Sequence, residues 1–303
     1  MYLVRYSEIA LKSEPVRRDW ENRLVQNIKR SLKTQKVGKE RGRIWVEEGD
    51  SKKLEKILGI QSFSPCSQCE LEELEDFVLD YAKKILKGKN SFGLKVKRSG
   101  DHDFTSQDVA KDLGGKIQKE MPRLCVNLDN PQKWIFIEIR DNNCYIFDKI
   151  FKGYGGLPVG SSGRLVSLFS GDINSAVSSW MMMKRGCEII PIYFDCNNQA
   201  DFDRAKELSY ALKDFYLDFD LKVVNCQINK KKMYEVVEKI AEETGAKGIV
   251  TGEALSLCRP GDERFEDLIE FNKFTKLPIY RPLTCLDKDE VEAISKRIGV
   301  EVK

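Results

Sequence analysis

The chain has 303 residues and a mass of 34.8 kDa, and 41% of its residues are hydrophobic and 33% charged. This composition is typical of a folded globular protein, and it excludes a predominantly disordered chain and a small disulfide-stapled domain. Arg5 and Glu8 interrupt any signal-peptide core, and no window holds the ~18 apolar residues of a membrane span, so we expect a cytoplasmic protein. The nine cysteines are expected to be mainly reduced thiols.

Charge is distributed unevenly along the chain. Residues 1–165 carry 31 Lys and Arg against 24 Asp and Glu, whereas residues 166–303 carry 20 against 24. The whole N-terminal excess lies in residues 1–43, which hold 12 basic and 5 acidic side chains. A localised basic surface suits a polyanionic partner, although a solvated helix face has the same composition.

The first predicted unit alternates short strands with amphipathic helices. Apolar residues recur with helical spacing between Val16 and Ser31, and Gly59 separates a second helix from a further strand. This βαββαβ-like order is that of a ferredoxin-like split βαβ unit. The predicted elements are strands Tyr2–Tyr6, Arg43–Val46 and Ile60–Ser64 and helices Val16–Ser31 and Lys52–Leu58.

A second α/β unit follows the first. Residues 70–87 carry the pattern of one amphipathic helix, and Gly88 is a suitable stop for it. The other predicted elements of this unit are strand 92–98, helix Ser106–Glu120 and strands Trp134–Arg140 and Cys144–Lys149.

The glycine-rich segment 152–164 is the best domain boundary in the chain. Beyond it, strands and helices alternate, which predicts a parallel sheet with helices on both faces. We therefore expect a ferredoxin-like domain (1–58), an α/β domain (59–164) and a doubly wound parallel-sheet domain (165–303). In the last, the predicted strands are Leu165–Phe169, Glu188–Phe194, Val223–Cys226 and Gly248–Thr251, with helices at Ser175–Lys184 and Met233–Thr244.

The loop after the first strand of the parallel sheet is the first candidate site, because ligands of such sheets bind at the carboxyl ends of the strands. Residues 170–175 read SGDINS, a glycine-containing turn into a helix with a hydroxyl at each end. Such a turn directs backbone N–H groups and the positive helix end at one spot, which suits phosphate or pyrophosphate. An ordinary strand-to-helix turn has the same pattern, and the loop matches neither Walker A nor GxGxxG.

Residues 165–195, LVSLFSGDINSAVSSWMMMKRGCEIIPIYFD, resemble the PP-loop motif of ATP pyrophosphatases in the form found in the tRNA 4-thiouridine synthetase (ThiI) family, also called tRNA sulfurtransferases. Residues 3–12, LVRYSEIALK, are similar to that family's opening strand, and FGLKVKRSGDHDFTSQDVAKDLGGKI is similar to its THUMP domain, an RNA-binding module. MYEVVEKIAEETGAKGIVTGEAL and LPIYRPLTCLDKDEVEAISKRIGVE resemble its later PP-loop strands and helices. The likeness is collinear over nearly the whole chain.

The resemblance implies a reaction in two stages. A uridine oxygen of tRNA is adenylated by ATP with release of pyrophosphate, and a cysteine persulfide then displaces AMP to leave 4-thiouridine. The implied cofactors are ATP and Mg²⁺, and the implied partners are tRNA and a separate sulfur donor, either a protein of the cysteine desulfurase type or sulfide. A homodimer is also implied. The alternative is a catalytically impaired relative that acts as a tRNA-binding module.

Carried over position by position, the resemblance implies an ATP site at the strand ends, with Lys230 or Lys231 in place of a family arginine near the phosphates. The expected ATP-binding residues are Leu168, Phe169, Ser170, Gly171, Asn174, Ser175, Tyr193, Phe194, Lys230 and Gly252. The expected RNA-binding residues are Arg17, Arg18, Arg23, Lys29, Arg30, Arg41, Arg43, Lys97 and Arg98.

Three departures from the family fall in the C-terminal domain. Asp172 replaces the second glycine of the motif and Asn174 its aspartate, so a carboxylate should repel phosphate and oppose a positive φ, or hold the metal instead. Residues 256–261, SLCRPG, replace a GQVASQT loop. The resemblance implies a sulfur-transfer cysteine after residues 297–299, where this sequence reads VEVK at 300–303. We therefore take Asp172 and Cys258 as candidate catalytic residues.

The remaining cysteines and the histidine give weaker signals. Cys66 and Cys69 form a single CxxC pair of a kind that can ligate zinc or a cluster, but no second pair has matching spacing, so the signal for a metal is weak. His102 is the sole histidine and lies in a polar loop, where a surface role is the simplest interpretation.

Overall fold

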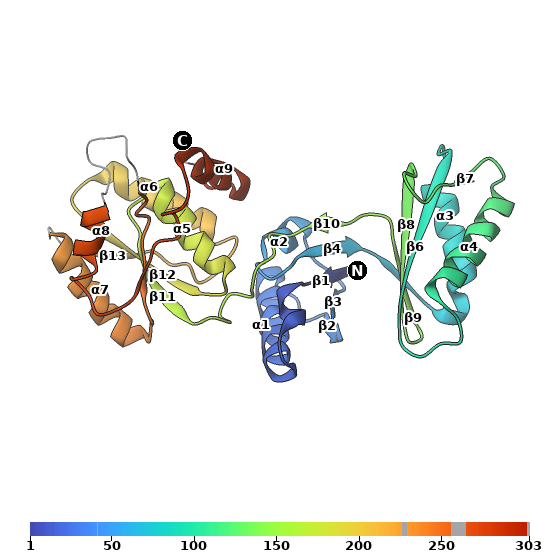
Figure 1. Ribbon diagram of the computed structural model, residues 1–303, viewed down its shortest axis with the longest axis horizontal. Coiled ribbons are helices and arrows are strands. Elements are labelled where there is room, and N and C mark those ends of the chain that lie inside the picture. Colours follow the sequence, from blue (N-terminus) through green and yellow to red (C-terminus); the bar gives the residue numbers. More distant parts are fainter. Residues whose placement is uncertain (41, 226–228, 256–264, 302–303) are drawn as a thin grey trace. The chain divides into compact units, whose positions relative to one another are not determined.

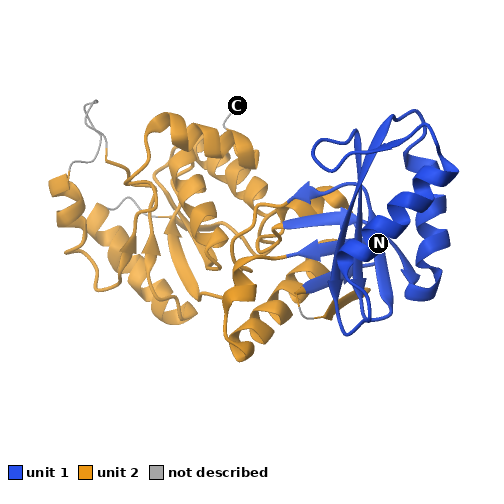
Figure 2. Ribbon diagram, turned by 45° about the vertical axis from the view of Figure 1, so that its right-hand side comes forward, with its two compact units in different colours: residues 1–5, 43–49, 62–152 blue, residues 6–42, 50–61, 153–303 orange. Residues whose placement is uncertain are grey.

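The computed structural model describes residues 1–40, 42–225, 229–255 and 265–301 (Figure 1). No helix within these ranges is long and apolar enough to cross a membrane. The described chain divides into two compact units, coloured separately in Figure 2. Unit 1 comprises residues 1–5, 43–49 and 62–152, and unit 2 comprises residues 6–42, 50–61 and 153–303. The predicted boundaries of three domains stay a prediction.

One sheet of unit 1 brings together strands that are far apart in the sequence. Strand β1 pairs antiparallel with β3 on one side and with β4 on the other, and β10 adds to the outer edge of β4. The bounds are β1 Tyr2–Arg5, β3 Arg43–Val46, β4 Ser62–Pro65 and β10 Phe151–Lys152. The predicted strand Ile60–Ser64 therefore begins two residues later than expected.

The second sheet of unit 1 has the order β5-β9-β8-β6-β7, with β6 parallel to β7 and β8 and the other pairs antiparallel. Two helices, α3 and α4, cover one face, where their apolar residues pack against the inward side chains of β6, β8 and β9. The bounds are β5 Ser67–Glu70, α3 Leu74–Ile85, β6 Ser91–Ser99, α4 Ser106–Glu120, β7 Cys125–Val126, β8 Lys133–Arg140 and β9 Asn143–Phe147.

Helix α4 has the predicted bounds because its first turn carries a complete capping box. The Thr105 hydroxyl accepts a hydrogen bond from the Asp108 N–H, and the Asp108 carboxylate accepts one from the Thr105 N–H. The predicted helix 70–87 is wrong at both ends. Residues 67–70 form strand β5, a 3₁₀ turn follows at Leu71–Glu73, and α3 ends at Ile85.

Glu138 is a buried carboxylate on the face of β8 opposite the two helices, with 4% of its surface exposed. The Arg43 Nε lies 2.8 Å from Glu138 Oε2, and the Arg5 Nε lies 3.2 Å from Glu138 Oε1. Burial raises the pKa of Glu138, but the hydrogen bonds and charges of Arg43 and Arg5 outweigh burial, so the pKa is lowered. Two half-buried arginines of unit 1 thus pair with one buried carboxylate.

Unit 2 contains a parallel sheet, as the alternating pattern predicted, and β15 adds a fifth strand to the four that were named. Its order is β13-β12-β11-β14-β15, and every pair is parallel. Chain order therefore reverses between β11 and β14, which is the point where ligands bind in such sheets. The bounds are β11 Arg164–Leu168, α5 Ile173–Lys184, β12 Glu188–Asp195, α6 Gln199–Leu212, β13 Lys222–Asn225, α7 Lys230–Thr244, β14 Ile249–Val250, α8 Phe265–Phe271, β15 Ile279–Tyr280 and α9 Lys288–Ile298.

Helices cover both faces of this sheet. On one face, Leu165 and Phe169 pack among residues of α5, α6 and α9. On the other face, Val166 and Ile192 pack against Tyr234 and other residues of α7. Successive residues of β11 therefore enter opposite cores, which is the behaviour expected of a strand buried on both sides.

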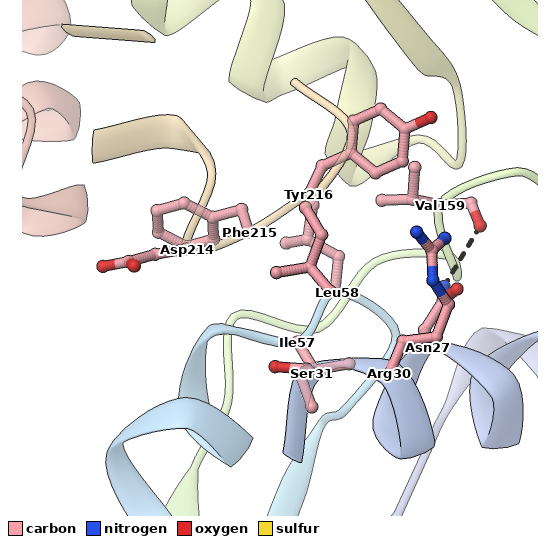
Figure 3. Close-up of a pocket in the computed structure, with 10 residues that line it drawn as sticks. Asn27, Arg30, Ser31, Ile57, Leu58, Val159, Asp214, Phe215 and Tyr216 are labelled. Atoms are coloured by element: carbon pink, nitrogen blue, oxygen red, sulfur yellow. Dashed lines mark hydrogen bonds between the residues drawn. The ribbon is translucent and has the colours of Figure 1, made fainter. Parts of the chain in front are cut away.

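Unit 2 also contains the N-terminal helices. Helix α1 spans Glu14–Leu32 and α2 spans Ser51–Lys56, with a 3₁₀ turn at Glu8–Leu11 and strand β2 at Val37–Glu40. Arg30 of α1 forms a two-bond ion pair with Asp218, and the Asn27 amide donates to the Val159 carbonyl oxygen at 3.1 Å. Figure 3 shows the small cavity beside these contacts. Its volume of about 30 Å³ suits one or two water molecules, so it is not a ligand site.

Candidate functional site

The loop between β11 and α5 can form only with glycine at position 171. Gly171 has a φ of +79°, and a Cβ atom there would lie 2.6 Å from the carbonyl oxygen of Asp201. Asp172, by contrast, has a φ of −105° in the extended region. The expectation that a side chain at position 172 opposes the backbone conformation is therefore wrong, because the positive φ belongs to Gly171 alone.

Asp172 is the N-cap of α5, and its carboxylate accepts the donors of the loop. The Ser175 N–H donates to Asp172 Oδ1 at 2.7 Å, and the Ser170 hydroxyl donates to Asp172 Oδ2 at 2.7 Å. The Ser175 hydroxyl donates to the Asp172 carbonyl oxygen at 2.9 Å, and Ser175 is buried. In this structure the Asp172 carboxylate therefore accepts hydrogen bonds at the N-terminal end of α5, where a bound anion would otherwise accept them.

Gly252, which follows β14, permits a second close approach of backbone. A Cβ atom at this position would lie 2.6 Å from the Ser175 nitrogen and 2.8 Å from the Asn174 carbonyl carbon. The segment after β14 consequently packs directly on the first turn of α5. Any larger residue at position 252 must displace the backbone that forms the loop.

A cavity of about 420 Å³ opens at the carboxyl ends of β11, β12 and β14. Of the residues expected to bind ATP, its wall contains Leu168, Phe169, Ser170, Asn174, Tyr193, Phe194, Lys230 and Gly252. Gly171 and Ser175 lie outside this wall; Gly171 borders a more open depression shared with Ser170, Asp172 and Arg204. The sequence reasoning missed the wall residues Ile192, Cys196, Asp201, Met233, Thr251 and Glu253, while Asp172, expected to be catalytic, is also in the wall.

Two of the expected adenosine contacts are mainly core residues. Phe169 is 1% exposed and its ring packs on Phe219, and Tyr193 is 4% exposed and packs on Phe202. Leu168 and Lys230 are more accessible. The accessible apolar side chains of the wall therefore include Leu168 and Met233, and Phe169 and Tyr193 lie in the core behind.

The expected RNA-binding residues have different surroundings. Arg17 is 8% exposed and pairs with Glu14 and Glu21, and Arg43 is half-buried and pairs with Glu138, so their RNA-binding role stays a prediction. Arg30 is exposed and paired with Asp218. Arg41 lies outside the described residues, as does Cys258. Arg18, Arg23, Lys97 and Arg98 are exposed, and Lys29 is half-buried.

The cysteines that the structure describes are free thiols. Burial raises the pKa of Cys66 to about 11, which keeps that thiol protonated. Cys69 lies directly opposite Cys144 in the β5–β9 ladder. Within the described ranges, no three His, Cys, Asp or Glu residues gather as a metal-holding group.

Three family models match successive parts of the chain. The ThiI ferredoxin-like domain matches residues 1–64, and the THUMP domain matches residues 69–148. The model described as thiamine biosynthesis protein (ThiI) matches residues 160–302. These matches follow the order of the elements along the chain.

Relatives and solved structures match nearly the full chain. A tRNA sulfurtransferase of Thermoplasma volcanium is 37% identical over 98% of this chain and 67% of its own length. A probable tRNA sulfurtransferase of Saccharolobus solfataricus is 37% identical over 96% of this chain and 84% of its own.

Among solved structures, a 4-thiouridine synthetase in complex with RNA and with bound ATP has a TM-score of 0.84 at 30% identity, over 99% of this chain and 84% of that one. PH1313 from Pyrococcus horikoshii has a TM-score of 0.83 at 28% identity, over 98% and 99%. The predicted fold is confirmed: a ferredoxin-like N-terminal domain, a THUMP domain and a C-terminal parallel-sheet domain.

Proposed function

The chain belongs to the tRNA sulfurtransferase family, and from this premise we propose that it catalyses the ATP-dependent thiolation of a tRNA uridine to 4-thiouridine. One observation carries the proposal: the SGDINS loop enters α5 at the point where strand order reverses, beside a cavity of about 420 Å³. That volume suits a nucleotide, and the cavity wall contains most of the residues expected to bind ATP.

In the proposed reaction, the C4 carbonyl oxygen of uridine attacks the α-phosphorus of ATP, and the bond to the β-phosphate breaks to release pyrophosphate. A sulfur nucleophile then attacks C4, the C4–O bond breaks, and AMP leaves. When the nucleophile is a persulfide, its outer sulfur becomes bonded to C4. A second thiol must then attack the protein-side sulfur of the C4–S–S group, so that the S–S bond breaks, a disulfide forms and 4-thiouridine is left. The N-terminal end of α5 and Lys230 supply the positive charge that the phosphates need.

Mg²⁺ and the other partners are part of the proposal. Asp172 and Asp201 place carboxylates in the cavity wall, and hard oxygen ligands of this kind suit Mg²⁺. When bound, the ion neutralises charge on the phosphates. We propose a separate sulfur donor, a cysteine desulfurase-type protein or sulfide, and a homodimer, on the strength of the family alone.

The test of the proposed function is release of pyrophosphate from ATP that depends on added tRNA. We expect the purified chain to release pyrophosphate with tRNA present and to form 4-thiouridine when sulfide is added. Chromatography of the digested tRNA identifies the product. Binding of tRNA without any pyrophosphate release contradicts the proposal.

Asp172 offers a test that separates charge from capping. Asp172→Asn keeps an acceptor for the Ser175 N–H, whereas Asp172→Ala removes it, so we expect only the alanine variant to lose about 1 kcal/mol of stability. Both variants lose the proposed magnesium ligand, and we expect Mg²⁺-dependent pyrophosphate release to fall about tenfold or more. ATP binding without Mg²⁺ should tighten, because a charge that repels phosphate is gone.

Thermal unfolding, calorimetric titration with ATP and the pyrophosphate assay measure these three effects of Asp172. A rise in pyrophosphate release by the asparagine variant contradicts its assignment as a metal ligand.

The exposed arginines of α1 test RNA binding. We expect Arg18→Glu with Arg23→Glu to weaken tRNA binding and to lower the slope of log affinity against log salt by about 2, one for each phosphate that an arginine no longer neutralises. The control is Lys239→Glu with Lys247→Glu, which makes the same change in charge at exposed positions of the acidic half. Filter binding at several salt concentrations gives both slopes. Equal losses in the two variants contradict a localised RNA surface.

A further inference from the structure

Glu253 is a buried carboxylate in the wall of the cavity, with 6% of its surface exposed. It follows β14 by three residues and lies next to Gly252, the residue that packs on the first turn of α5. None of the roles described so far uses this carboxylate. Burying a carboxylate is unfavourable unless cations and hydrogen bonds compensate for the lost water. The side chains around Glu253 therefore indicate its role.

Four side chains converge on the Glu253 carboxylate. The Arg281 Nε donates to Oε2 at 2.7 Å, and the Lys230 Nζ lies 3.2 Å from Oε1. The hydroxyls of Thr251 and Tyr234 donate at 3.1 and 3.4 Å. Two cations face one carboxylate, so the cluster carries a net positive charge at the edge of the cavity.

The two cations are held differently. The Arg281 guanidinium is 11% exposed; its Nη1 donates to Asn272 Oδ1 at 2.9 Å and its Nη2 to the Leu268 carbonyl oxygen at 3.4 Å. These bonds fix Arg281 to the end of α8. Lys230 has a 38% exposed side chain, and its ammonium lies 3.5 Å from the centre of the Phe271 ring. Arg281 therefore fixes Glu253, while Lys230 reaches the cavity surface.

We propose that Glu253 is a positioning residue that holds the Lys230 ammonium at the cavity edge, where it meets the phosphates of the nucleotide. This proposal rests on the proposed function, because it requires a nucleoside triphosphate in this cavity. Lysine is a point charge on a flexible stem with much rotamer freedom, so a partner fixed by Arg281 and Thr251 reduces the entropy lost when the ligand binds.

The position of Lys230 in its helix supports this arrangement. Lys230 is the first residue of α7, and the Asn229 side chain caps the helix by accepting from the Lys232 N–H at 3.0 Å. The backbone that carries the lysine is therefore fixed by a cap. Glu253 contacts the lysine side chain from a different strand end of the same cavity.

The test compares the affinities for ATP and adenosine in four variants. We expect Lys230→Ala and Glu253→Gln each to weaken ATP binding about tenfold, as loss of one charge-assisted hydrogen bond does, with adenosine binding unchanged. Because Glu253 acts through Lys230, the double variant should bind ATP no more weakly than Lys230→Ala. Lys232→Ala is the control, since Lys232 is an exposed lysine of the same helix that is absent from the cavity wall.

Calorimetric titration distinguishes positioning from support of the fold. A structural role would change ATP and adenosine binding together, whereas positioning changes only their ratio. An unchanged or raised ratio of ATP to adenosine affinity in Glu253→Gln overturns the proposal. So does a loss of ATP affinity in the double variant that equals the product of the two single losses.

If Glu253→Gln does not fold, the double variant Glu253→Gln with Arg281→Met replaces both members of the ion pair. We expect this variant too to bind ATP more weakly and adenosine unchanged. Failure of the proposed function looks different, because the native chain itself would then bind no ATP.

Discussion

Replacing Gly252 with alanine should lower ATP affinity and tRNA-dependent pyrophosphate release roughly a hundredfold, the effect expected of an ångström-scale displacement in a catalytic site. The added Cβ would lie 2.6 Å from the Ser175 nitrogen and 2.8 Å from the Asn174 carbonyl carbon. Both are backbone atoms of the first turn of α5, so no side-chain rotation relieves the contact. The turn has to move, and it carries the groups that face the phosphates.

The matched control is Gly115→Ala in α4, where no atom lies within 4 Å of the new Cβ. Alanine there should leave ATP binding unchanged and stabilise the helix by up to about 1 kcal/mol. Calorimetric titration with ATP and thermal unfolding measure both variants. If Gly252→Ala binds ATP with the affinity of the native chain, the first turn of α5 tolerates displacement, and phosphate binding does not require its exact position.

The largest loss of stability is expected from Glu138→Ala. This change removes the buried carboxylate that pairs with the half-buried Arg5 and Arg43, and removing one partner of a buried ion pair costs about 3–5 kcal/mol. Asp112→Ala breaks an exposed contact with Lys116 and should cost far less, because solvent screens an exposed ion pair. Urea unfolding measures the free energies, and amide hydrogen exchange of residues 133–140 locates the loss. Equal effects of the two changes contradict the assignment.

The dependence of stability on pH tests the same carboxylate. The pKa of Glu138 is lower in the folded chain than in the unfolded chain. Its contribution is therefore complete above the unfolded pKa and is lost as the pH falls through the folded value. The native chain should lose stability at acid pH more steeply than Glu138→Ala, which lacks this titrating group. A difference between the two curves that stays constant as the pH falls would contradict this origin.

The sequence predicted elements best where local signals were complete. Helix α4 has a capping box at Thr105 and Asp108, and its bounds agree with the prediction. Strand β5 was missed because four residues, SQCE, carry no strand pattern of their own and depend on pairing with β9. Strand β2, VGKE, was missed for the same reason. Local propensity cannot identify a strand whose stability comes from its neighbour.

The site was predictable to the extent that motifs mark strand ends. Leu168 is the last residue of β11, Ser170 follows β11 and Gly252 follows β14, and the cavity wall includes all three. The surroundings of charged residues were harder to predict. Arg17 and Arg43 belong to a basic segment that suggests an RNA surface, yet both pair with buried carboxylates. Glu253 was missed because its importance arises from Arg281, 28 positions later. Pairings of this kind exist only once the chain has folded.

The pairing of β10 with β4 can form only late in the synthesis of the chain. Phe151 and Lys152 pair with Phe63 and Ser62, and the rings of Phe63 and Phe151 stack. Because a ribosome releases the chain from its N-terminus, the edge of β4 stays open until the whole β5–β9 sheet has been synthesised. A fragment that ends before residue 151 keeps that edge open permanently, and we expect it to self-associate through β4 where the full chain does not.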